Sequence, residues 1–158
     1  KESSEKMQAP MCYCKNMSVD AILHYYAGQL EDAGVSFHHS IEVPQKMKIT
    51  DLDICRIFGN LLENAVRAVK ADKETEEPYV NCICRVRMGK LLIDIENSYS
   101  GEVRRNGDVF YSTSHSGQGI GTASVSKTAE KYGGYADFEA SEGVFRANVF
   151  IPLENSGS

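Results

Sequence analysis

Apolar residues recur at the spacing of an amphipathic helix in three segments of the chain. The first predicted helix starts at an N-cap of Ser18 and stops at Gly34. The second starts at Thr50, where a Ser/Thr-x-x-acid cap precedes the apolar stripe. The third runs from about Gln118 to Tyr132, after which Gly133 ends it. The pattern therefore predicts three helices spread along the whole chain.

Other segments alternate apolar and polar residues, as half-buried strands do. The predicted strands are residues 35–43, 79–88, 90–97, 135–140 and 143–151. His38 and His39 lie on the first of them, and we expect both to face solvent rather than to bind a ligand. Cys82 and Cys84 alternate on the second and share a face with Val80, so we expect reduced core cysteines rather than a metal site or disulfides.

Residues 98–117 show no convincing periodicity and are rich in Ser, Gly, Asn, Tyr and Arg. Loops longer than about 12 to 15 residues are uncommon and are usually lids or disordered segments. We interpret this one as a lid. The candidates for phosphate contact in this lid are Arg104, Arg105 and His115. The alternative for each is an exposed charged side chain that has no functional role.

Size and charge limit the possible functions. With 158 residues, 42% hydrophobic and 25% charged, the chain is long enough for one globular domain with a proper core. We expect a linker at residues 1–14, the domain at 15–153 and a tail at 154–158, cytoplasmic in character and part of a longer protein. The net charge of −5 argues against nucleic-acid binding, which requires clustered Lys and Arg.

Three alternate glycines, Gly117, Gly119 and Gly121, stand where the third helix begins. Glycine lets backbone N–H groups approach a ligand closely, and a helix N-terminus attracts anions. The run is therefore a candidate phosphate cradle, and a flexible hinge is the alternative.

Three asparagines also require an explanation. Asn60 and Asn64 are four residues apart, so both lie on one edge of the second helix. Their amide oxygens could bind Mg²⁺ and the polyphosphate it carries, since a hard cation prefers oxygen ligands. Alternatively, they cap or bridge neighbouring loops. Asn97 ends the buried row of its strand, where the edge of a purine base would satisfy its amide.

The order of these parts resembles the GHKL ATPase superfamily, and within it the catalytic ATP-binding domain of sensor histidine kinases. The resemblance depends on the run 60–65 (NLLENA), on Gly117-x-Gly119-x-Gly121 and on 131–134 (KYGG). It implies an α/β sandwich of the Bergerat type, in which three helices cover one face of a mixed five-stranded sheet and an ATP lid closes the site. The quorum-sensing branch is the most similar, because there an asparagine also replaces the usual aspartate at Asn97.

Carried over by position, the resemblance implies a Mg-ATP site in which Asn60 and Asn64 are catalytic and Asn64 binds the metal. Asn97 would accept a hydrogen bond from the adenine amino group, more weakly than a carboxylate would. The usual Asp-x-Gly-x-Gly reads here as Asn-Ser-Tyr-Ser-Gly, so the acid and its first glycine are both replaced. The nucleotide-binding residues implied are Asn60, Glu63, Asn64, Arg67, Asn97, Gly101, Gly117, Gln118, Gly119, Ile120, Gly121 and Thr122.

The same resemblance separates three functions. Hydrolases of the superfamily carry a water-activating glutamate where this chain has Asn60, and an amide cannot act as a general base. Glu63 is the possible substitute. We therefore expect a histidine kinase domain whose partners are an upstream histidine-bearing dimerisation domain and a response regulator. The alternatives are a catalytically silent binding module, a GHKL ATPase and a serine kinase of the anti-sigma type.

Overall fold

The computed structural model describes residues 12–100, 103–106, 109–112 and 118–153. For 103–106, 109–112 and 118–120 only the backbone is described. Gly101, His115 and Gly117, three residues of the predicted site and lid, lie outside the described residues. The elements in chain order are α2 (Met17–Asp32), β1 (Ser36–Ile41), α3 (Asp51–Ala71), β2 (Tyr79–Arg87), β3 (Lys90–Ser98), β4 (Val103–Asn106), β5 (Val109–Ser112), α4 (Gln118–Lys131), β6 (Tyr135–Ser141) and β7 (Val144–Pro152).

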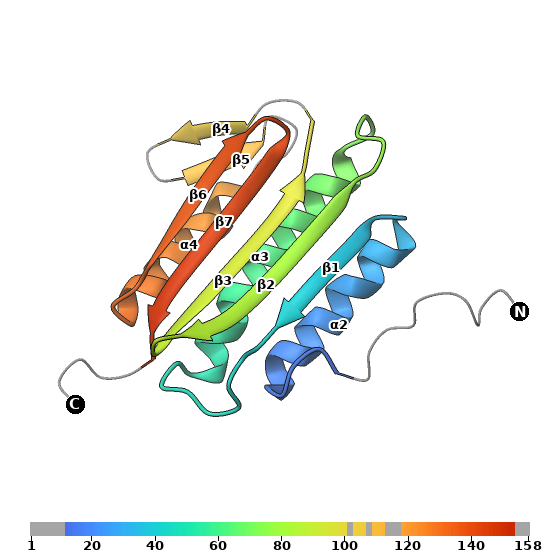
Figure 1. Cartoon of the computed structure of the whole chain (residues 1–158). Helices are drawn as coiled ribbons and strands as arrows, with labels where there is room; N and C mark the ends of the chain where they lie inside the picture. The colour runs from blue at the N-terminus through green and yellow to red at the C-terminus, as the bar shows by residue number, and fades with distance from the viewer. Residues whose placement is uncertain (1–11, 101–102, 107–108, 113–117, 154–158) are drawn as a thin grey trace, which may run out of the picture.

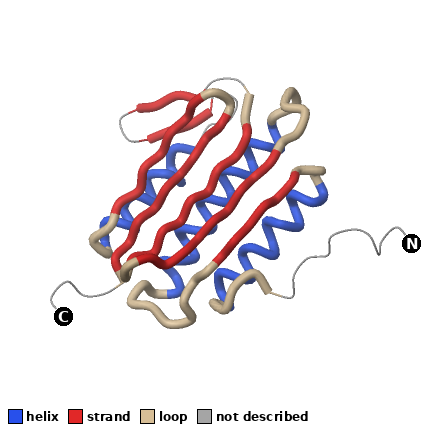
Figure 2. Tube along the Cα trace, in the orientation of Figure 1, coloured by secondary structure: helices blue, strands red, loops and turns tan. Residues whose placement is uncertain are grey.

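Five strands form one mixed sheet in the order β1-β2-β3-β7-β6. β1 pairs with β2 in parallel, and the other neighbours are antiparallel. The three helices α2, α3 and α4 pack on the same face of this sheet (Figures 1 and 2). The predicted α/β sandwich and its sheet are thus confirmed, and each helix and strand expected from the pattern lies within a few residues of its predicted range.

The core lies between the helices and the covered face of the sheet. The alternate β3 residues Leu91, Ile93, Ile95 and Asn97 are all buried, as their shared face predicts. Its neighbour β2 contributes its own buried residues, among them Cys82 and Cys84. Burial raises the pKa of the Cys84 thiol to about 12 and raises the pKa of the Cys82 thiol well above its ordinary value, so neither is a reactive thiolate at neutral pH.

The start of α2 differs from the prediction. Asn16, not Ser18, is the N-cap, and its side-chain oxygen accepts a hydrogen bond from Val19 N at 3.1 Å. Asn and Ser cap helices about equally well, so the residue type alone does not decide between Asn16 and Ser18. Asn16 is buried, whereas Ser18 belongs to the first turn of α2 and its hydroxyl donates to Asp51 Oδ2 at 3.5 Å.

The predicted lid region contains structure that the pattern did not indicate. β4 and β5 pair antiparallel as a separate two-stranded sheet, with Arg104 opposite Tyr111. Strands of four residues are too short for alternation to be recognised in the sequence.

On β1, His38 and His39 are both exposed, as predicted.

No helix among the described residues is long and apolar enough to span a membrane. Nor do these residues contain a group of three or more His, Cys, Asp or Glu side chains that could hold a metal ion.

Candidate functional site

The two asparagines of α3 and the glycine run of α4 meet in space. A Cβ atom built on Gly121 would lie 3.7 Å from the Oδ1 atoms of both Asn60 and Asn64. The first turn of α4 therefore lies against the asparagine edge of α3 without a side chain between them. Two amide oxygens and the backbone at a helix N-terminus converge there, as the predicted phosphate cradle requires.

The local sequence explains how α3 presents this edge. Thr50 caps the helix by accepting from Asp53 N at 3.1 Å, and the apolar stripe, which includes Phe58, Leu61 and Leu62, is buried against the sheet. Asn60 and Asn64 are half-buried because they border this stripe. Their amides can therefore reach a ligand at the rim without entering the core.

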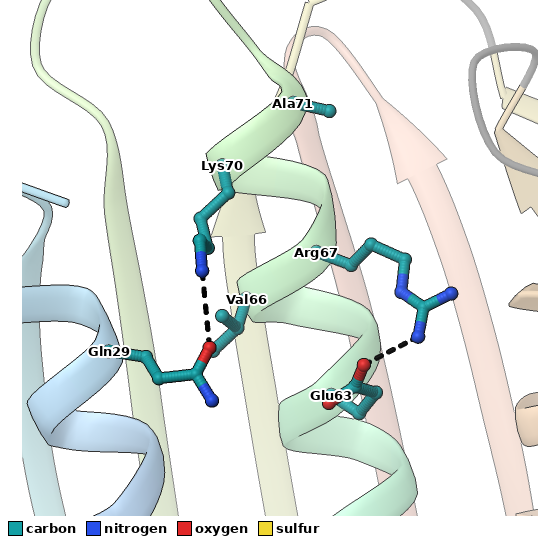
Figure 3. Close-up of a pocket in the computed structure, with 6 residues that line it drawn as sticks. All are labelled: Gln29, Glu63, Val66, Arg67, Lys70 and Ala71. Carbon is teal, nitrogen blue, oxygen red and sulfur yellow. Dashed lines mark hydrogen bonds and ion pairs between the residues drawn. The ribbon is translucent and has the colours of Figure 1, made fainter.

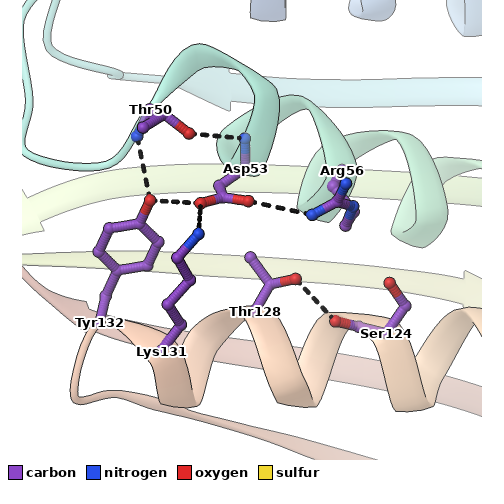
Figure 4. Close-up of polar contacts among 7 residues, drawn as sticks. All are labelled: Thr50, Asp53, Arg56, Ser124, Thr128, Lys131 and Tyr132. Atoms are coloured by element: carbon purple, nitrogen blue, oxygen red, sulfur yellow. Dashed lines mark hydrogen bonds and ion pairs between the residues drawn. The ribbon is translucent and has the colours of Figure 1, made fainter.

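A polar cluster at the other end of α4 holds the two helices together (Figure 4). Asp53, whose side chain is 3% exposed, accepts from Lys131 Nζ at 2.8 Å, from Arg56 Nη1 at 3.1 Å and from the Tyr132 hydroxyl. Tyr132 in turn accepts from Thr50 N at 3.2 Å. The Lys131 and Tyr132 hydrogen bonds hold the pKa of Asp53 below its ordinary value, against the effect of burial. This clamp fixes how α4 lies along α3, and therefore where Gly121 meets the asparagines.

Asn97 lies at the end of β3, 2% exposed, between Val80 of β2 and Phe145 of β7. Its Nδ2 atom donates to Ser98 O at 2.9 Å. The amide nitrogen donates to the backbone, which leaves the Oδ1 atom to accept a hydrogen bond. An adenine amino group is a donor and therefore needs such an acceptor. The structure thus agrees with the buried amide expected at this position.

The Glu63 carboxylate forms hydrogen bonds with two neighbouring side chains of the protein. Its carboxylate accepts from Arg67 Nη2 at 2.5 Å and from the Tyr26 hydroxyl at 3.0 Å. The Arg67 hydrogen bond is the main cause of a lowered Glu63 pKa, and burial together with this carboxylate raises the pKa of Tyr26 to about 12. A carboxylate that is stabilised in its ionised form is a weak base, so Glu63 is poorly suited to activate water.

A pocket of about 370 Å³ opens beside this pair, between α2 and α3 (Figure 3). It is lined by Gln29, Glu63, Val66, Arg67, Lys70 and Ala71. No pattern in the sequence indicated a role for Gln29, Lys70 or Tyr26. The available signal for Lys70 was its position three residues after Arg67, which puts both on one side of α3.

The structure therefore brings together some of the predicted site residues. Asn60, Asn64 and Gly121 converge, and Glu63 and Arg67 pair next to them. Thr122, the next residue of α4, is buried. Gln118, Gly119 and Ile120 form the first turn of α4, described by its backbone alone.

Comparison with known proteins defines the class. A protein-family model described as the GHKL domain matches residues 47–152, and the chain belongs to this family. It is a GHKL ATP-binding domain that resembles histidine kinase catalytic domains in structure. No protein among the curated sequences matches the chain.

Several solved structures share the fold. The catalytic domain of the histidine kinase ThkA is 15% identical with a TM-score of 0.67, over 87% of this chain and 91% of that one. The mycobacterial sensor histidine kinase MprB is 18% identical with a TM-score of 0.65, over 86% and 93%. Full-length ShkA in complex with AMPPNP is 17% identical with a TM-score of 0.65; the match covers 89% of this chain but 30% of ShkA.

Proposed function

We propose that this chain is the ATP-binding catalytic domain of a two-component sensor histidine kinase. It would position Mg-ATP for transfer of the γ-phosphoryl group to a histidine on an upstream domain. The observation that carries the proposal is the convergence of the Asn60 and Asn64 oxygens on the backbone of Gly121. An arrangement of neutral oxygen ligands and backbone N–H groups suits Mg²⁺ and the polyphosphate that accompanies it.

The residues favour a kinase over a hydrolase. An amide at Asn60 cannot take a proton from water, and Glu63 is held ionised by Arg67 and Tyr26. Transfer to a neutral imidazole needs no such base, because the imidazole is itself the nucleophile. The protein then contributes orientation and charge neutralisation. Bound Mg²⁺, for which Asn64 is the proposed protein ligand, would supply part of that neutralisation.

The described histidines, His24, His38 and His39, lie on α2 and β1 rather than on α3 or α4. His24 of α2 pairs with Asp20 at 3.5 Å and contacts the ring of Tyr13, and His39 of β1 contacts the same ring. Both belong to the α2–β1 side of the domain, away from α4. We therefore propose that the acceptor lies on an upstream dimerisation domain, which would make the intact protein a homodimer that signals to a response regulator. From the resemblance to sensor histidine kinases, we also propose that the intact protein is a membrane-bound sensor with this domain in the cytoplasm. Its assignment to the quorum-sensing branch depends on Asn97 alone.

Binding of Mg-ATP is the first expected result. At a 100-fold excess over its Kd, the ligand should raise the free energy of unfolding by about 2.7 kcal/mol. Asn64→Ala should abolish the magnesium-dependent part of this stabilisation, measured as the difference in thermal midpoint with and without Mg²⁺. Asn148→Ala, on the opposite face of the sheet, is the matched control and should bind normally. An unchanged magnesium-dependent shift in Asn64→Ala would remove this residue from the site.

Turnover and labelling then separate the candidate functions. A kinase domain should bind Mg-ATP, hydrolyse it negligibly and remain unlabelled when incubated alone with radioactive ATP. Rapid hydrolysis would favour the ATPase, and the absence of any shift would favour a silent binding module. Label on a histidine of this chain would overturn the proposal of an upstream acceptor, and label on a partner's serine would favour the anti-sigma type of kinase.

A further inference from the structure

Asp72 joins the helix layer to the chain segment that follows Asn97. It is the C-cap of α3, and its Oδ1 atom accepts a hydrogen bond from the Ser100 hydroxyl at 2.5 Å. Ser100 comes three residues after Asn97. The C-terminal ends of α3 and β3 accordingly lie at the same end of the domain (Figure 1). One hydrogen bond thus connects the helix that carries Asn64 with the strand that carries Asn97.

The Asp72 carboxylate is itself held firmly by the turn after α3. It accepts from Glu74 N at 3.0 Å, from Thr75 N at 3.2 Å and from the Thr75 hydroxyl. Burial opposes its ionisation, but the hydrogen bonds from Ser100, Thr75 and the backbone of the turn outweigh burial and lower the pKa of Asp72 to about 2. The carboxylate is therefore ionised at neutral pH, and hydrogen bonds to an ionised acceptor are stronger than those between neutral groups.

The two residues before Ser100 are held by the sheet. The Ser98 hydroxyl accepts from Tyr79 N of β2 at 3.0 Å. Tyr99 N donates to Gly143 O, in the turn between β6 and β7, at 3.0 Å. These contacts fix the segment relative to its neighbouring strands. The Asp72 contact fixes it relative to α3, which is a separate requirement, because sheet pairing does not set the separation between a strand end and a helix.

We propose that Asp72 is a positioning residue for the base end of the nucleotide site, where it holds the end of β3, through Ser100, at the separation from α3 that lets Asn97 accept from the adenine amino group. The inference rests on the proposed function, because it assumes that a nucleotide lies between α3 and the end of β3. Asp72 itself does not touch the ligand. Its effect comes through geometry, since a hydrogen bond weakens steeply when its angle departs from the preferred range.

The test compares ATP with ITP, whose base carries an oxygen in place of the amino group, in titration calorimetry with Mg²⁺. The parent should bind ATP more tightly than ITP. Ser100→Ala should weaken ATP binding about fivefold, roughly the contribution of one hydrogen bond, and ITP binding by less than about twofold. Asp72→Ala should have the same effect, and the double variant should be no weaker than either single one.

Two further variants separate positioning from a general loss of structure. Asp72→Asn keeps an oxygen that can accept from Ser100, so it should retain most of the preference for ATP. Thr75→Ala is the matched control, because it removes a contact inside the turn and leaves the Ser100 hydrogen bond, and it should leave both affinities unchanged. Without ligand, Ser100→Ala should unfold at the same temperature as the parent.

The other outcomes overturn the inference in distinguishable ways. Equal weakening of ATP and ITP would mean that the substitutions disturb the whole site rather than the base end. Unchanged affinities in Ser100→Ala and Asp72→Ala would limit Asp72 to its own turn. A parent that bound ATP and ITP equally would show that Asn97 does not recognise the amino group, while the proposed function would stand. A parent that bound neither nucleotide would contradict the proposed function itself.

Discussion

Gly134→Ala is expected to destabilise the domain by about 3 kcal/mol or more, beyond the usual cost of an overpacked site. A Cβ atom on Gly134 would lie 1.9 Å from Phe150 O and 2.9 Å from Ile151 Cα. Both are backbone atoms of β7, which hydrogen-bonds to β3 on one side and β6 on the other. Neither can yield as the end of a flexible side chain would, so the ladder between β6 and β7 must shift.

Urea unfolding followed by circular dichroism measures this effect, with Gly28→Ala as the control. Gly28 lies within α2 and has open space where a Cβ would stand. There the alanine should stabilise the helix by up to about 1 kcal/mol. Equal unfolding midpoints for the two variants would contradict the close approach of Gly134 to β7.

Asp53→Ala is expected to lower the free energy of unfolding by about 1.5 to 3 kcal/mol, the range for hydrogen bonds to a charged group. The substitution removes the buried carboxylate that joins the start of α3 to the end of α4 through Lys131 and Tyr132. Since this clamp also places Gly121 beside the asparagines, Mg-ATP affinity should fall as well. Denaturant unfolding at pH 7 and calorimetry measure the two effects.

The control for this variant is Asp51→Ala. Asp51 is an exposed acid in the same first turn, so it shares the helix-dipole interaction but not the clamp. It should cost less than about 1 kcal/mol. A loss equal to that of Asp53→Ala would mean that the dipole, rather than the clamp, accounts for the stability.

The pH dependence of the Asp53 contribution has a definite sign. The pKa of this carboxyl is lowered from 3.8 in the folded state, chiefly by the Lys131 hydrogen bond. The folded state therefore binds the proton less readily than the unfolded state does, and the contribution is fully present above the unfolded value. It is lost as the pH falls below 3.8 through the folded pKa. The stability difference between the parent and Asp53→Ala should accordingly narrow as the pH falls below 3.8, and a constant difference would contradict the assignment.

Local patterns were sufficient for most of the fold. The Thr50 cap, the apolar stripe of α3 and the alternation of β3 are properties of neighbouring residues, and periodicity reveals them directly. The same holds for the two asparagines on one edge of α3 and for the buried position of Asn97. β4 and β5 were not recognised, because strands of four residues carry too little periodicity.

Contacts between segments that are distant in the sequence could not be predicted from periodicity. The sequence by itself determined which residues face one side of each helix and strand, since that depends on the regular rotation of the backbone. Only the tertiary structure decided that Gly121 lies 3.7 Å from both asparagine oxygens and that Gln29 faces Lys70. The tertiary structure also decided the hydrogen-bond partners of Asp53. The cap motif predicts that its carboxylate returns to the N-cap N–H, but the Tyr132 hydroxyl accepts from that group while Asp53 binds Lys131 and Tyr132. The physical reason is that α3 and α4 meet through packing on a shared sheet, and no local preference of either helix specifies its partner.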